Sequence, residues 1–307
     1  MNIYLDQNVL GHASVGRYKL PTKREIIWIY STEHFNEISR GDKVQLRAFL
    51  QSIRARRIEV VTDKKGRITD QFKICPYENP RLLFERYVQH IKSLGVDLSV
   101  FNSVISACFG SQDELALGEY PRQLGEMLRA PLKGVADLDE LLGERLEKFG
   151  RYIGESTIKS LSSTRPLEKQ RKPLGFDKGR ASKLAEGANP LCDLWDHANR
   201  HYPATISRDK FFGFEPILDL GYDRWPEFLG IVSCYTLLNA IGFFPDKGLA
   251  NPSRVPANSS DGNHVAYAAF CDGLISADTR LCVKARAIYL YRGIGTRVFD
   301  VSELIDK

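Results

Sequence analysis

The sequence predicts an α/β fold whose sheet is formed by segments from both ends of the chain. Residues 2–5 and 26–30 are short apolar runs, typical of strands that are buried on both faces. Near the C-terminus, residues 261–271 have the small side chains of a helix that lies closely on a sheet, and residues 273–277 form another apolar run. Since buried strands need neighbours, we expect the strands at the two ends of the chain to share one sheet.

Composition indicates an ordinary globular protein. The 307 residues are 43% hydrophobic and 26% charged, which suits one large domain or two smaller ones. No apolar run approaches the roughly 20 residues that span a bilayer, and the N-terminus is typical of a strand followed by an acid, not of a signal peptide. The six cysteines form no CxxC pair, which favours reduced thiols. We therefore expect a soluble, cytoplasmic protein that does not enter a membrane.

Charge is unevenly distributed along the chain. The net charge is +5, but residues 40–65 and 165–183 are strongly basic whereas residues 113–155 are acidic. Two basic stretches suit a polyanionic partner such as a nucleic acid, and the alternative is ordinary solvated surface charge. The candidate nucleic-acid contacts in the basic stretches are Arg54, Arg56, Arg57, Lys169, Arg171 and Lys172.

The middle of the chain has a different pattern from the ends. Residues 57–62 and 67–74 are typical of a hairpin that turns at 64–66, and residues 80–160 have mostly helical periodicity. Residues 162–190 are rich in Ser, Pro, Gly and basic residues, as in a linker. Helices are expected at 190–201 and 224–243. The predicted organisation is a discontinuous core, 1–62 and 222–307, and a mostly helical insertion, 63–221, with a basic linker around 162–190.

Acidic residues follow or precede the predicted core elements. Asp6 follows the first strand, Glu33 and Glu37 share one face of a helix that Ser31 caps, and Asp278 follows the strand 273–277. Ser259, Ser260 and Asp261 are good N-cap residues, so we expect a helix to begin close to Asp261. Asp6 can instead be a turn residue, and Asp261 and Asp278 can be simple helix caps.

Chain lengths predict that these acids converge. A helix over 261–271 descends by about 15 Å, and a strand over 273–277 climbs back by about 13–16 Å, which returns Asp278 to the level of Asp261. Ionised carboxylates at one place repel each other, and a divalent cation relieves that repulsion. Oxygen ligands favour Mg²⁺ or Mn²⁺ over Zn²⁺. Such a site can activate water and neutralise a phosphodiester.

Three segments resemble the motifs of the PIN-domain nucleases. They are Asp6-Gln7-Asn8-Val9-Leu10, the segment from Ser31 to Glu37-Ile38, and the segment from Asp261 through Ala268-Ala269 to Leu274-Ile275-Ser276-Ala277-Asp278. The resemblance implies a three-layer α/β/α core with a mainly parallel sheet. It also implies hydrolysis of RNA, or of single-stranded DNA, with Mg²⁺ or Mn²⁺ bound by Asp6, Glu37, Asp261 and Asp278.

The resemblance further implies roles for the residues around these acids. Asn8 and Ser276 would hydrogen-bond the acids, Glu33 is the alternative to Glu37, and His264 would contact the substrate phosphate or the surroundings of the metal. The interval from 37 to 261 is far longer than in compact members of this family. The insertion is therefore expected to carry substrate choice or a partner surface.

Other functions are compatible with the sequence. The nuclease could be a toxin or a phage-defence enzyme that an inhibitory partner protein blocks, and it could form a homodimer as compact PIN-domain proteins do. A non-catalytic module that binds nucleic acid or protein could retain the same fold. A phosphatase of the haloacid-dehalogenase type needs a second aspartate two residues after its nucleophile, and Asn8 occupies that position.

Overall fold

The computed structural model describes residues 1–21, 25–41, 44–94, 98–111, 113–130, 139–162, 167–176, 179–203, 205–216 and 221–304. The chain forms two compact units. Unit 1 comprises Met1–Phe84, Arg171–Asp246 and Ala257–Lys307, and unit 2 comprises Glu85–Gln170 and Lys247–Pro256. All the residues predicted to form the acidic site belong to unit 1.

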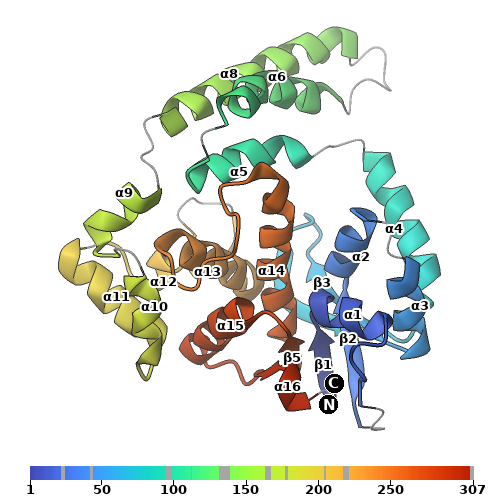
Figure 1. Ribbon diagram of the computed structural model, residues 1–307. Coiled ribbons are helices and arrows are strands. Elements are labelled where there is room, and N and C mark those ends of the chain that lie inside the picture. Colours follow the sequence, from blue (N-terminus) through green and yellow to red (C-terminus); the bar gives the residue numbers. More distant parts are fainter. Residues whose placement is uncertain are drawn as a thin grey trace. The chain divides into compact units, whose positions relative to one another are not determined.

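Unit 1 is built on a six-stranded sheet with the order β4-β3-β2-β1-β5-β6. The strands are β1 (Asn2–Leu5), β2 (Ile27–Ser31), β3 (Arg56–Thr62), β4 (Ile68–Ile74), β5 (Gly273–Ser276) and β6 (Arg297–Asp300). All neighbouring pairs are parallel except the hairpin of β3 and β4. The predicted α/β class, with a mainly parallel sheet shared by both ends of the chain, is therefore confirmed (Figure 1).

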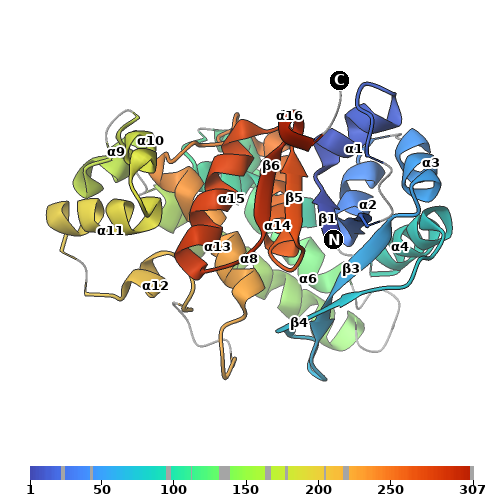
Figure 2. The same cartoon turned by 90° about the horizontal axis from the view of Figure 1, so that it is seen from below.

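The central strand β1 joins the two ends of the chain. Tyr4 lies beside Ile29 of β2 and beside Leu274 of β5, and all three residues are fully buried. Helices α13 (Glu227–Ile241), α14 (Val255–Ala268) and α15 (Thr279–Arg292) cover one face of the sheet, and α1 (Gln7–Ser14), α2 (Thr32–Ser39) and α3 (Val44–Ser52) cover the other (Figure 2). The apolar side chains of the strands therefore point alternately into the two layers of helices, as expected for strands that are buried on both faces.

Two helices of the core differ from the prediction. Residues 7–14 form α1, a helix that the sequence did not predict, because Asp6 caps the helix and Val9, Leu10 and Ala13 are buried. Helix α14 begins at Val255, more than one turn before Asp261. Proline is well tolerated in the first turn of a helix, so Pro256 starts this helix instead of ending the preceding segment.

The remaining elements of unit 1 lie between β4 and α13 in the sequence, except for α16 near the C-terminus. They are α10 (Arg180–Lys183), α11 (Pro190–His201), α12 (Arg208–Phe211) and the 3₁₀ turns η4 (Lys172–Leu174) and η5 (Leu184–Glu186); α16 (Val301–Leu304) ends the described chain. Three of the described helices have residues in both units: α4 (Pro80–Leu94), α9 (Leu167–Arg171) and α14, whose first two residues belong to unit 2. Within the described residues, no helix is long and apolar enough to cross a membrane.

Unit 2 is helical within its described residues. It contains η1 (Leu98–Phe101), α5 (Asn102–Cys108), α6 (Glu114–Arg129), the π-helical turn η3 (Asp139–Gly143), α8 (Glu144–Ser162) and η6 (Pro252–Arg254). Glycines bring α6 and α8 into backbone contact: a Cβ added at Gly150 would lie 2.7 Å from Gly125 Cα, and one at Gly154 would lie 2.5 Å from Pro121 Cα. Because these glycines have no side chain, the backbones of α6 and α8 can pack directly against each other.

The units divide the chain differently from the predicted core and insertion. Residues 63–84 belong to unit 1, since β4 pairs with β3 and Phe72 packs against the core. Residues 171–221 also belong to unit 1 in the part that the structure describes. The predicted basic linker contains short helices, and its Phe176 is buried in the same core. Only a few widely spaced apolar side chains of this segment pack against the core, so its polar composition did not predict that it belongs to unit 1.

Gly273 allows β5 to lie close to its two neighbours. A Cβ at this position would lie 2.7 Å from Ile3 Cδ1 and 2.8 Å from the Phe299 ring. We expect Gly273→Ala to lower the free energy of unfolding by about 1–3 kcal/mol, as overpacking of a core commonly does. Gly295→Ala is the control, because nothing lies within 4 Å of its added Cβ. Urea denaturation measures both changes, and equal effects of the two substitutions would contradict the packing argument.

Candidate functional site

The candidate site lies at the carboxyl edge of the parallel sheet, where β1 and β5 end side by side. The chain passes from β1 to β2 on one side, whereas β5 lies on the other side and is followed by β6. The topological switch point therefore falls between β1 and β5, the position at which open α/β sheets bind ligands. The Asp6 amide donates to Ile275 O at 3.0 Å. The two strand ends are therefore level.

Asp6 is buried, and both of its carboxylate oxygens accept hydrogen bonds. Oδ1 accepts from the Gln7 amide at 2.7 Å, and Oδ2 accepts from Asn8 Nδ2 at 2.5 Å and from Ser276 Oγ at 2.6 Å. Asn8 and Ser276 thus make hydrogen bonds of the kind predicted for them. Burial raises the pKa of Asp6 above its usual value, although the charge of His264 and the Ser276 hydrogen bond act in the opposite direction.

Asp278 is joined to Asp6 through the hydroxyl of Ser276. This hydroxyl accepts from the Asp278 amide at 3.0 Å while it donates to Asp6. Asp278 also caps α15, because its Oδ1 accepts from the Arg280 and Leu281 amides at 2.8 and 3.1 Å. The Ser276 hydroxyl therefore links the Asp6 carboxylate to the backbone of Asp278, while the Asp278 carboxylate itself caps α15.

Asp261 lies inside α14, because this helix begins at Val255. The predicted helix start near Asp261 is wrong, and so is the alternative that Asp261 is an N-cap. Its side chain is partly buried and has no hydrogen-bond partner among the described residues. Burial, followed by the nearby charges of Asp6 and Asp246, raises the pKa of Asp261 well above its usual value. A carboxylate in this position has no evident structural role.

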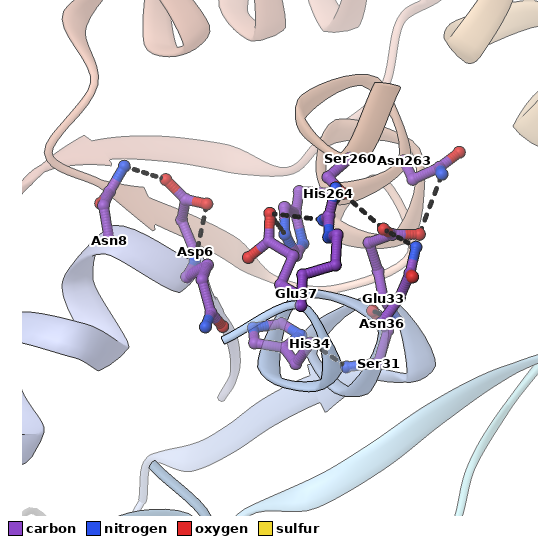
Figure 3. A network of polar contacts seen from close by, with 12 residues as sticks. Asp6, Asn8, Ser31, Glu33, His34, Asn36, Glu37, Ser260, Asn263 and His264 are labelled. Atoms are coloured by element: carbon purple, nitrogen blue, oxygen red, sulfur yellow. Dashed lines mark hydrogen bonds and ion pairs between the residues drawn. The ribbon is translucent and has the colours of Figure 1, made fainter. Parts of the chain in front are cut away.

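Glu33 and Glu37 both point from α2 toward α14, but their surroundings differ (Figure 3). The two oxygens of Glu33 accept from Ser260 Oγ at 2.5 Å, Asn36 Nδ2 at 2.9 Å and Asn263 Nδ2 at 2.9 Å. Glu33 therefore links the two helices. Glu37 Oε1 lies 3.6 Å from His264 Nε2, whereas its Oε2 is buried without a hydrogen-bond partner in the described chain.

His264 is completely buried beside Glu37, so it contacts this acid and not a surface that a substrate can reach. Its Nδ1 lies 2.8 Å from the hydroxyl of Tyr4. Burial alone would lower the pKa of His264, but the nearby carboxylate of Glu37, followed by that of Asp6, outweighs it and raises the pKa to about 9. His264 is thus a cation at neutral pH, and its charge lowers the pKa of Glu37 against the opposing effect of burial.

A neighbouring histidine is held in the neutral form. Burial, followed by the charge of His264, lowers the pKa of His34 to about 3. His34 Nε2 lies 2.7 Å from Leu5 O and therefore donates to it, while Nδ1 accepts from the Ser31 amide at 3.1 Å. These two contacts fix the tautomer and complete the cap of α2.

Sequence reasoning missed a buried lysine and its partners. Lys284 Nζ donates to Asp246 Oδ1 at 2.5 Å and to Asn239 Oδ1 at 2.7 Å, and it lies 3.9 Å from the centre of the Tyr235 ring. Lys284 is fully buried on α15. Burial lowers its pKa, while Asp246 and then Asp261 and Asp278 act to raise it. The only hint in the sequence was a lysine at a position of α15 that faces the core.

The predicted nucleic-acid contacts lie in different surroundings. Arg54, Arg56, Lys169 and Lys172 are exposed, whereas Arg57 pairs with Glu59 at 2.5 Å. Arg171 donates to Ala240 O at 2.6 Å and Asn239 O at 3.0 Å, so it caps the C-terminal end of α13. Lys169 belongs to unit 2 and the other five belong to unit 1.

A divalent cation at the carboxyl edge of the sheet would require several oxygen ligands close together. Within the described ranges, no group of three or more His, Cys, Asp or Glu side chains is arranged so that it could hold a metal ion. The donor chemistry nevertheless suits Mg²⁺ or Mn²⁺. The acids outnumber the cations His264 and Lys284, and the Asp261 carboxylate and Glu37 Oε2 are acceptors without partners. The residues fit a hard cation in charge and in donor type.

Comparison with known proteins adds no identification. No family model, no curated protein and no solved structure matches the chain.

The pair of Lys284 and Asp246 gives a prediction for stability. Lys284→Met would leave the buried Asp246 carboxylate without its cation, so we expect the free energy of unfolding to fall by about 3–5 kcal/mol. Arg286→Met on the same helix removes a partner of the exposed pair with Glu303, and we expect a change within about 1 kcal/mol. Chemical denaturation compares the two variants. A similar, small loss in both would show that the buried pair is not needed.

Substitution of Asp261 is expected to change the free energy of unfolding in the opposite direction. Because the folded-state pKa of Asp261 is raised, the stability that it contributes is present in acid and is lost as pH rises through that pKa. Asp261→Asn should therefore raise the free energy of unfolding at pH 7, in the range of about 0.5–2 kcal/mol that single stabilising substitutions commonly give. The gain should shrink as pH falls toward the usual carboxyl pKa of 3.8.

Asp196→Asn is the matched control for this substitution. The Asp196 side chain is 61% exposed, so we expect a change of less than about 0.5 kcal/mol at any pH. Thermal or urea unfolding of both variants between pH 4 and 8 makes the comparison. A destabilised Asp261→Asn variant at pH 7 would contradict the placement of an unpartnered carboxyl group whose ionisation is opposed by burial.

Proposed function

We propose that the protein is a Mg²⁺- or Mn²⁺-dependent endoribonuclease with a PIN-like core. The observation that carries the proposal is the group of acids at the switch point of the sheet. The Ser276 hydroxyl joins the Asp6 carboxylate to the backbone amide of Asp278, and Asp261 lies close enough to Asp6 for the two charges to interact. The resemblance of the surrounding segments to PIN-domain motifs supports the same assignment.

The acids would hold one or two divalent cations. Asp6, Asp261 and Asp278 are the proposed ligands, with Glu37 beside them, and a bound cation supplies activation of water and neutralisation of phosphate charge. The chain's own residues prepare this site. Asn8 and Ser276 fix the Asp6 carboxylate, and the cap of α15 fixes Asp278. His264 keeps Glu37 ionised, which preserves its ability to accept a cation or to orient water.

RNA is the proposed substrate, with single-stranded DNA as the alternative. The exposed basic residues of unit 1, such as Arg54, Arg56 and Lys172, are available to bind phosphates. A role as a toxin or defence nuclease, with an inhibitory partner protein that covers the acids, is compatible with this function. So is a homodimer.

Cleavage of single-stranded RNA in the presence of Mn²⁺ tests the function. We expect cleavage that EDTA abolishes and that falls by at least about a hundredfold in Asp261→Asn and Asp278→Asn, since a metal supplies several kcal/mol of transition-state stabilisation. Asp272→Asn is the control, because Asp272 precedes β5 at the opposite end of the same strand and accepts from the Asn2 amide. Cleavage by Asp278→Asn at the rate of the unmodified chain would refute the assignment.

A binding measurement complements the cleavage assay. A cation that binds only the folded chain stabilises it by about 2.7 kcal/mol at a hundred times its Kd. Mn²⁺ should therefore raise the unfolding midpoint of the unmodified chain and of Asp272→Asn, but not that of Asp261→Asn. If RNA binds tightly while Mn²⁺ changes no midpoint, a non-catalytic nucleic-acid-binding module replaces the nuclease as the better description.

A further inference from the structure

Unit 1 contains an apolar pocket that the acidic site does not use. Its volume is about 320 Å³, and it lies between η4, helix α11, the segment after α11 and helix α12. The residues that line it are Leu174, Trp195, Ala198, Asn199, Tyr202, Thr205, Ile206 and Phe211. This volume is at the lower end of the range of small-molecule sites, about 300–1,000 Å³. A pocket of this size suits a single planar group better than a folded peptide segment.

The walls of the pocket are aromatic and rigidly placed. Trp195 and Phe211 meet edge to face with ring centroids 5.3 Å apart. Their helices are fixed to the core, since Phe212 packs against Tyr291 of α15 and Asp209 accepts from the Tyr291 hydroxyl. The part of the pocket that α11 and α12 form is therefore held in place by the core.

The rim of the pocket is open and carries polar groups. The Tyr202 side chain is 64% exposed, which is unusual for a large aromatic residue and leaves a ring face available for stacking. Thr205 is exposed on the same rim, and the Asn199 side chain lines the wall. A ligand that fits is planar and aromatic, with hydrogen-bonding groups on its edge.

Charges of both signs lie next to the pocket: Asp193 and Asp196 flank Trp195, and Asp196 lies 3.8 Å from Arg208, while several basic side chains are exposed. Lys172 and Arg200 are exposed and are close in sequence to the lining residues Leu174 and Asn199, and Lys210 precedes Phe211. Among the acids nearby, Asp209 is engaged with Tyr291 and with Arg292 at 3.3 Å. Aromatic stacking surfaces beside basic side chains are the combination by which proteins bind single-stranded nucleic acids.

We propose that this pocket binds an unpaired nucleobase of the RNA substrate. The base would stack on Tyr202 and lie against Trp195 and Phe211, while the adjacent basic residues contact the flanking phosphates. The inference rests on the proposed action on RNA and adds a base-binding subsite to it. α12 contacts the C-terminal end of α15, whereas Asp278 begins that helix, so the bound base lies about one helix length, roughly 21 Å for 14 residues, from the acids.

Binding measurements on the full chain in EDTA test the subsite without cleavage. The probe is a single-stranded RNA hexamer, compared with an abasic strand of equal length and charge. Stacking on one aromatic side chain has a large effect on affinity, so Tyr202→Ala should weaken binding of the RNA by at least about fivefold and leave the abasic strand unaffected. Tyr202→Trp should restore RNA binding. The exposed position of Tyr202 makes loss of folding an improbable cause.

Two controls make the result specific. Tyr152→Ala removes a tyrosine of similar exposure, 69%, from α8 in unit 2, and RNA affinity should stay within twofold. RNA should also quench tryptophan fluorescence, and Trp195→Phe should abolish most of that quenching while calorimetry still detects binding. The slope of affinity against salt should be the same for Tyr202→Ala and the unmodified chain, because no phosphate contact is removed.

The outcomes separate this inference from the proposed function. Equal RNA affinity of Tyr202→Ala and the unmodified chain would overturn the subsite even if the chain cleaves RNA. Quenching of Trp195 by an apolar peptide but not by RNA would overturn it in favour of a protein-binding pocket. Base-dependent binding through Tyr202 in a chain that does not cleave RNA would support the subsite and count against the nuclease alone.

Discussion

The parallel pairing of β1 with β5 is the contact on which the rest of unit 1 depends. It joins residues that are 270 positions apart, Asp6 and Ser276, and sets their strand ends level. Closing so long a loop costs little more than closing one of half the length, since each doubling adds only about 0.6 kcal/mol. What makes the pairing specific is close packing: Gly273 lets the side chains of Ile3 and Phe299 meet over the strand. Without that pairing, the four N-terminal strands and the two C-terminal strands would not form one sheet.

The electrostatics of the carboxyl edge follow from this pairing. It brings several acids into a region of low solvent access, where burial opposes ionisation. The chain relieves part of this conflict with its own cations: His264 offsets Glu37, and Lys284 offsets Asp246. Asp6 and Asp278 are stabilised differently, by hydrogen bonds from amides and hydroxyls. Asp261 accepts no side-chain hydrogen bond within the described residues, and the charges of His264 and Lys284 only partly offset its burial, so it is the acid that would gain most from an external cation.

Much of the core could be predicted from the sequence, because buried strands and acids at strand ends are local patterns. The strands around Tyr4, Ile29 and Leu274 and the hairpin of β3 and β4 are visible as apolar runs with turn residues between them. Helix α1 was not predicted, since its polar first residues conceal three buried ones. The start of α14 was misplaced because Ser259, Ser260 and Asp261 are all good N-cap residues, whereas the helix begins at Val255, with Pro256 in its first turn.

The cations of the site were harder to predict than its acids. A buried lysine is recognisable only by its partners, and Asp246 and Asn239 come from an unrelated part of the sequence. In the same way, the basic stretch from 165 to 183 was interpreted as a linker because its composition is polar. Phe176 is nevertheless buried in the core, and the Arg171 guanidinium caps α13. Composition describes the average residue of a segment, whereas one buried side chain decides where the segment lies.

Helix α15 connects the two features to which we assign function. Asp278 caps its first turn, and Tyr291 and Arg292 near its last turn contact α12, which forms part of the aromatic pocket. A helix of 14 residues is a rigid spacer of roughly 21 Å, too long for the same nucleotide to reach both ends. A base held in the pocket would therefore select the strand at a distance from the bond that is cut. Lys284, near the middle of the same helix, is fully buried and bonded to Asn239 and Asp246, so the spacer is held against α13 and the segment that follows it.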